Sequence, residues 1–137
     1  MPRDAFPLSK ARSYALGSGW RWCVCELECQ PHRYRLLVAF DQGKEQYQAW
    51  LGLQVGGDQA LIGRLEYHPS HRGWHCHLKT GDLSEAARGV VKEPGRREKC
   101  KVCDENAPFG ISEANGLAVA FRVFGVQSSF EDGGLFS

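Results

Sequence analysis

Four of the chain's five histidines fall within ten residues, at His68, His71, His75 and His77. Imidazole is the side chain most useful near neutral pH, as a metal ligand or as a carrier of protons. The spacing therefore predicts a functional site in the segment 65–79.

Two expected strands, 60–68 and 74–79, must position these histidines. Successive side chains of a strand point to opposite faces. Polar residues of the first strand share one face: Arg64, Glu66 and His68. Polar residues of the second strand also share one face: His75, His77 and Lys79.

Burial of the apolar residues should select the register of this hairpin. The residues expected on one buried side are Leu61, Leu65, Tyr67, Trp74, Cys76 and Leu78. A slip of one residue would expose a whole apolar set, so we predict a connecting loop with an even number of residues. The polar residues then gather as a compact cluster of Glu66, His68, His75 and His77, flanked by Arg64 and Lys79, with His71 in the loop above it.

Two chemistries fit such a cluster. In the first, His68, His75 and His77 hold a divalent transition metal, zinc or manganese, with room for water. In the second, Glu66 orients one histidine as a general base and another histidine acts as the acid. Arg64 and Lys79 would then stabilise an anionic transition state, which suits metal-independent cleavage of a phosphodiester. A solvated polar sheet face without a function remains the alternative to both.

The string Trp74-His75-Cys76-His77-Leu78 resembles the His-hydrophobic-His motif of the HUH single-strand endonucleases. The resemblance implies an antiparallel sheet on which His75 and His77 help to hold a divalent metal. That family's nucleophilic tyrosine lies on a helix after the motif, whereas the last tyrosine of this chain is Tyr67. The resemblance therefore does not extend to a covalent mechanism.

A second metal site is suggested by Cys100 and Cys103, whose Cys-X-X-Cys spacing is half of a structural zinc site. The remaining ligands could come from Cys23, Cys25 and Cys29, or from His71. In the expected strand 20–29, Cys23, Cys25 and Cys29 share one face with Leu27, which is typical of a core.

Basic residues are concentrated between Arg88 and Lys101, where six basic side chains face two acidic ones, an excess of 6 − 2 = +4. Arg96 and Arg97 in this stretch could capture phosphate, together with His71 and Lys79. We therefore expect RNA or DNA as a possible partner through this basic segment.

The expected architecture is α+β: an antiparallel meander of about five strands with two helices packed mainly on one face. The strands are expected at 20–29, 34–40, 46–55, 60–68 and 74–79. One helix is expected at 86–91, after Asp82 or Ser84, and a longer one opens at Ser112-Glu113, with its apolar stripe at Leu117, Ala118, Phe121 and Phe124. Residues 1–17 are expected to be loosely ordered, and 92–109 to form a polar basic loop.

Composition places these elements in one domain of 137 residues, 1–137, with 42% hydrophobic residues and a net charge of +1. The sequence contains no apolar stretch that predicts a signal peptide or a membrane span, so a cytoplasmic setting with reduced cysteines is expected.

The first functional hypothesis is a small hydrolase, a nuclease or phosphodiesterase acting on nucleic acid. The alternatives are a non-catalytic binding or regulatory module stabilised by metal, and a protein-interaction domain. In the last, exposed Trp20, Trp22 and Trp50 would contact a protein partner or a second copy of the chain.

Overall fold

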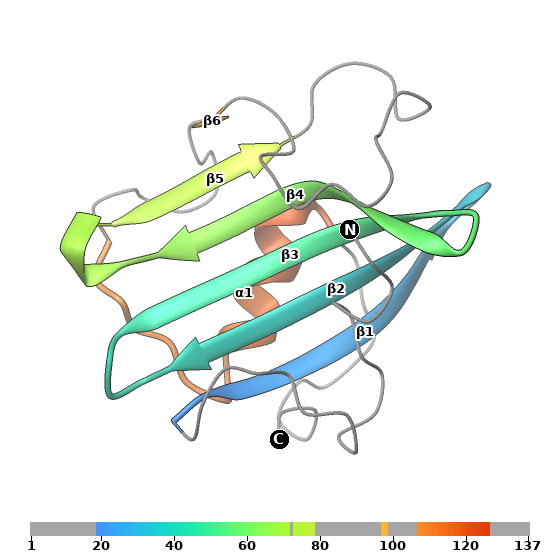
Figure 1. Cartoon of the computed structure of the whole chain (residues 1–137). Coiled ribbons are helices and arrows are strands. Elements are labelled where there is room, and N and C mark those ends of the chain that lie inside the picture. Colours follow the sequence, from blue (N-terminus) through green and yellow to red (C-terminus); the bar gives the residue numbers. More distant parts are fainter. Residues whose placement is uncertain (1–18, 72, 79–96, 99–106, 127–137) are drawn as a thin grey trace.

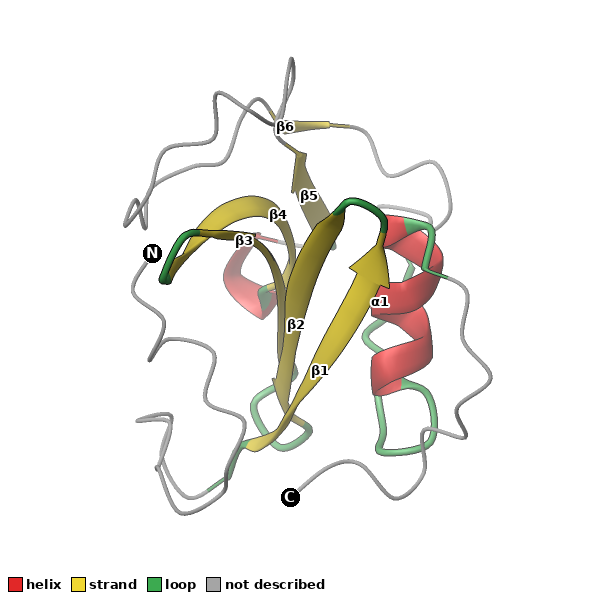
Figure 2. Ribbon diagram, turned by 90° about the vertical axis from the view of Figure 1, so that its right-hand side faces the viewer, coloured by secondary structure: helices red, strands yellow, loops and turns green. Residues whose placement is uncertain are grey.

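The computed structural model describes residues 19–71, 73–78, 97–98 and 107–126. Their strands form one antiparallel sheet in sequence order: β1(Arg21–Cys29), β2(His32–Asp41), β3(Gln46–Val55), β4(Asp58–Tyr67), β5(Trp74–Leu78) and β6(Arg97–Glu98). A 3-10 turn, η2(Pro69–His71), connects β4 to β5, and the helix α1(Gly116–Phe124) lies against one face of the sheet (Figures 1 and 2).

The five-stranded antiparallel meander and the α+β class are confirmed. Two strand expectations need correction. Strand β2 begins at His32, which pairs with Cys29, rather than at the expected residue 34. Arg97 and Glu98 form a short sixth strand against β5, within the segment expected to be loop.

One α-helix, α1, is found in the described residues instead of two; the expected helix 86–91 lies outside them. No helix among them is long and apolar enough to cross a membrane.

Helix α1 begins at Gly116, four residues after the expected start at Ser112. The Ser112 backbone N–H donates to Asn115 Oδ1 at 2.8 Å, and the Asn115 side-chain amide donates to the Gly110 carbonyl at 2.8 Å. Short polar side chains that bond nearby backbone in this way favour a turn over a helix. The helix also presents Ala118 to solvent, so Ala118 is not part of its buried stripe.

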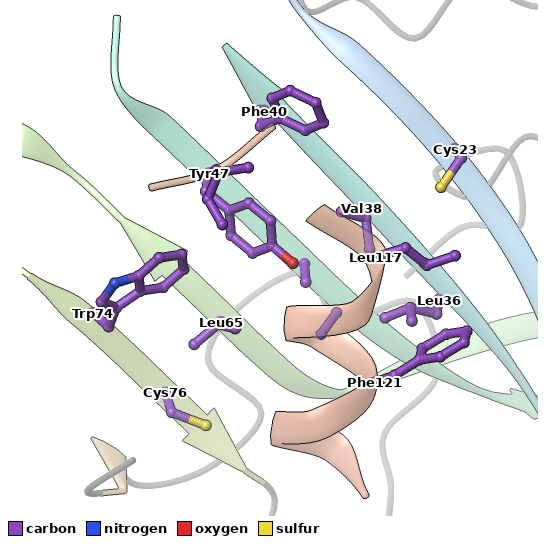
Figure 3. Packing of buried hydrophobic residues seen from close by; sticks show 13 residues of the cluster. Cys23, Leu36, Val38, Phe40, Tyr47, Leu65, Trp74, Cys76, Leu117 and Phe121 are labelled. Atoms are coloured by element: carbon purple, nitrogen blue, oxygen red, sulfur yellow. The ribbon is translucent and has the colours of Figure 1, made fainter. Parts of the chain in front are cut away.

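The main core lies between α1 and the sheet face that it covers (Figure 3). Its buried members are Cys23, Leu36, Val38, Phe40, Tyr47, Ala49, Leu65, Trp74, Cys76, Ile111, Leu117, Ala120 and Phe121. The Tyr47 ring is directed toward α1, where its hydroxyl donates to the Gly116 carbonyl at 2.7 Å. This bond ties the start of the helix to the middle of the sheet.

A β-bulge divides β4 into two parts. Leu51 pairs with Gly63 and Gly52 pairs with Leu61, which leaves Ile62 as the extra residue. Because side chains alternate along a strand, the insertion places Leu61 on the face opposite α1, and the expectation that Leu61 shares a face with Leu65 was wrong. The hairpin between β3 and β4 bends away from α1 (Figure 2).

The sheet face opposite α1 has a small apolar cluster of its own. Leu37 and Leu61 are buried there, and Trp22, Val24 and Trp50 pack against them. The tryptophans expected to be exposed, Trp20, Trp22 and Trp50, are each half-buried. This face is therefore not a wholly solvated surface.

Replacing Tyr47 with Phe should lower the free energy of unfolding by about 0.5–1.5 kcal/mol, because the buried hydrogen bond from the phenol to the Gly116 carbonyl is lost. Burial also raises the pKa of Tyr47 well above its ordinary value. The neutral phenol therefore stabilises the fold fully below about pH 10, and this contribution is lost as the pH rises toward the folded-state pKa. Urea unfolding at pH 7 and above pH 10 should show both effects, and an equal alkaline loss in wild type and Tyr47→Phe would contradict the assignment.

Replacing Gly63 with Ala should destabilise the fold by about 1–3 kcal/mol through overpacking. A Cβ atom at Gly63 would lie 2.8 Å from Phe124 Cε1 and 3.4 Å from Leu51 Cβ. The double variant Gly63→Ala/Phe124→Leu should recover part of the loss, because Leu leaves the new methyl more room. Thermal unfolding of both single variants and the double variant measures this coupling, and strict additivity would show that Phe124 is not the obstacle.

Candidate functional site

The β4–β5 hairpin has the register that gathers its polar residues. Glu66 pairs with His75, and Arg64 pairs with His77. Leu65 pairs with Cys76 on the other face, where both are buried beneath α1. The connection 68–73 contains six residues between the last pair, Tyr67 with Trp74, so the predicted even loop is confirmed.

Glu66 links two basic side chains of its own strand segment. Its Oε2 lies 3.2 Å from His68 Nε2, and its Oε1 lies 3.8 Å from Arg64 Nη1. The carboxyl side chain is 18% exposed, against 39% for His68, so the group is held in a partly dry position beside a more accessible imidazole. An ionised carboxylate can only accept, so His68 Nε2 donates to Glu66, and the contact fixes the tautomer and orientation of His68.

His77 extends the site to the next row of the sheet, directly opposite Arg64. Its Nδ1 is buried, and no residue in the described part of the chain gives it a hydrogen-bond partner. An unpartnered buried nitrogen costs about 1–3 kcal/mol. Stability from the described contacts alone therefore does not explain a histidine at this position.

Several predicted site residues either have no described side chain or lie outside the described residues. The backbone of Arg97 pairs with His77, so Arg97 and Glu98 lie beside β5 at the edge of the sheet. His71 lies in η2, the turn between β4 and β5. The side chains of these two residues are not described, and Lys79, Arg96, Cys100 and Cys103 lie outside the described residues altogether.

The metal sites expected from sequence are not assembled by the described side chains. No three His, Cys, Asp or Glu residues among them lie close enough to hold a metal ion. Cys23 and Cys25 of β1 point to the α1 face, and three strands separate β1 from β5 in the sheet. A hydrogen bond with Cys23 lowers the pKa of the Cys25 thiol, against the opposing effect of burial. The β1 cysteines and the histidine hairpin are thus separate features.

The sequence interpretation missed an aromatic and charged continuation of the histidine face. Trp50 pairs with Arg64, so Trp50, Arg64 and His77 form one row across three strands. A neighbouring part of this face carries the ion pair between Arg35 Nη2 and Glu26 Oε1, at 3.1 Å. Alternation along β3 gives the face on which Trp50 lies, but its pairing with Arg64 depends on the register between β3 and β4.

Replacing His77 with Leu should leave the melting temperature unchanged or raise it, because an unpartnered buried nitrogen gives way to apolar atoms. Cys76→Ser, at the adjacent position on the α1 face, is the contrasting variant, since it puts a hydroxyl into the core and should lower the melting temperature. Differential scanning calorimetry of both variants tests this. A drop of several degrees in His77→Leu would assign His77 a structural role.

No protein-family model, no curated protein and no solved structure matches this chain. The arrangement of the site itself is therefore the basis for a function. Its central features are one carboxylate that holds two basic side chains, and two histidines on the facing strand.

Proposed function

We propose that the protein is a hydrolase of the phosphodiesterase class, acting on nucleic acid. The observation that carries the proposal is the placement of Glu66, which contacts His68 and Arg64 and lies directly opposite His75. A carboxylate, an oriented imidazole and a guanidinium on one sheet face are the groups that acid–base cleavage of a phosphate ester requires.

The proton-transfer roles follow from the order of the groups on the face. His68, oriented by the Glu66 carboxylate, acts as the general base, and the carboxylate stabilises the imidazolium that forms. His77 lies on the other side of Glu66 from His68. It acts as the general acid that gives a proton to the leaving oxygen. A phosphate between them has its attacking and leaving oxygens on opposite sides, as in-line displacement requires.

Arg64 and His75 complete the proposed site. The Arg64 guanidinium contacts Glu66, and Arg64 pairs with His77 across the sheet, so it would neutralise the charge that develops on the phosphate oxygens. His75 faces the same phosphate from β5. The backbone pairing of Arg97 with His77 supports an approach of RNA or DNA along the basic segment that includes Arg96.

Acid–base chemistry is favoured over metal-assisted hydrolysis because its contacts are already made by the described residues. A zinc or manganese ion on His68, His75 and His77 would need these side chains to converge further, or His71 to join them. A chelator would leave the acid–base mechanism intact but would abolish metal-assisted hydrolysis.

Activity toward single-stranded RNA and DNA oligonucleotides tests the proposal. His68→Ala and His77→Leu should each lower the cleavage rate about 10²–10⁴-fold, because each removes one proton-transfer group. The matched control is His32→Ala, an exposed histidine on β2 remote from the site, which should cleave like wild type. Equal activity in all four proteins would remove the histidine face as the site.

The same assay in the presence of EDTA separates the two chemistries. Undiminished cleavage is expected for the acid–base site. Loss of cleavage, with recovery on addition of zinc or manganese, would replace it with a metal site on His68, His75 and His77.

A further inference from the structure

We infer that the substrate is single-stranded RNA, cleaved through its own 2′-hydroxyl, with a base stacked on Trp50. The inference rests on the proposed phosphodiesterase function and adds the class of nucleic acid, the nucleophile and a base-binding residue. Its geometric basis is the row Trp50, Arg64, His77.

The three residues of this row belong to adjacent strands, β3, β4 and β5, and point to the face opposite α1. Adjacent strands lie about 4.7–4.9 Å apart, so the row extends about 10 Å from the aromatic ring to the imidazole. A nucleotide presents base, sugar and 3′-phosphate in the same order. A base on the Trp50 ring thus directs its 3′-phosphate to Arg64, next to Glu66.

Trp50 is suited to a flat apolar ligand. It packs against the buried pair Leu37 and Leu61, which fixes the indole on the sheet while leaving it half-buried rather than enclosed. Stacking of a base on an aromatic side chain contributes about 1–3 kcal/mol and requires a base that is not already stacked in a duplex. The positive charge of Arg64 beside the ring complements the phosphate that follows such a base. Single-stranded nucleic acid is the ligand that matches both features.

The groups on the face also favour ribose over deoxyribose. They comprise proton donors, proton acceptors and a cation, and such groups can catalyse attack by a nucleophile that the substrate itself supplies. A 2′-hydroxyl is held next to the phosphorus by the substrate itself, and intramolecular attack of this kind has an effective molarity of about 10⁵–10⁸ M. The site then needs only to move protons and neutralise charge.

The proposed step is a transesterification. His68 takes the proton of the 2′-hydroxyl, and the 2′-oxygen forms a bond to phosphorus. The bond between phosphorus and the 5′-oxygen of the next nucleotide breaks, and that oxygen takes a proton from His77. The products are a 2′,3′-cyclic phosphate and a free 5′-hydroxyl, with no change in oxidation state and no water consumed.

Three oligonucleotides of one sequence distinguish the possible outcomes: all-ribose, all-deoxyribose, and deoxyribose with a single ribonucleotide. We expect cleavage of the first, none of the second, and one cut directly after the ribonucleotide in the third, leaving a cyclic phosphate detectable by mass spectrometry. Cleavage of the all-deoxyribose strand would overturn the inference and keep the phosphodiesterase. Cleavage of none of them would overturn both.

The role of Trp50 is tested with the all-deoxyribose strand as a non-cleavable probe and with steady-state cleavage of the all-ribose strand. Trp50→Leu keeps an apolar side chain against Leu37 and should weaken binding about tenfold or more, by fluorescence anisotropy, and raise KM more than it lowers kcat. Trp50→Phe keeps an aromatic ring and should retain most of the affinity. Equal affinities of wild type and both variants would overturn the stacking role, as would equal losses in the two variants.

Discussion

The register of β4 against β5 is the constraint on which the rest of the site depends. It is set by burial on the other side of the sheet, where Leu65, Trp74 and Cys76 pack beneath α1. Because side chains alternate, the register that buries these three also places Glu66 opposite His75 and Arg64 opposite His77. Packing of the core therefore decides which polar side chains lie opposite one another on the other face of the sheet.

The bulge at Ile62 determines how far this polar face extends. Without the extra residue, Leu61 would continue the α1 face below Leu65; with it, Leu61 joins Leu37 on the opposite side. Gly63 follows directly, and its lack of a side chain lets Phe124 of α1 approach the strand. The inserted residue therefore supplies an apolar base for Trp50 on one face, while Gly63 beside it admits the helix end on the other.

The charged groups of the site add little to stability in their present arrangement. Contacts of Glu66 with Arg64 and His68 are partly exposed, and such pairs contribute about 0–1 kcal/mol. The buried nitrogen of His77 opposes folding. The fold is instead stabilised by the opposite face, where Tyr47 and the apolar side chains contact α1. This separation lets one face of the sheet carry function while the other carries stability.

The meander could be predicted from the sequence because it follows from local alternation and turn residues. The even loop and the shared face of Arg64, Glu66, His75 and His77 could be predicted because only this register buries the apolar residues of both strands on one side. The sequence by itself did not determine the side of Leu61, the start of α1 at Gly116 or the row that joins Trp50 to Arg64. Each of these depends on contacts between segments distant in the chain, or on a bulge or a turn that interrupts the local pattern. Only the tertiary structure decided them, since alternation counts residues along one strand and register is a relation between two.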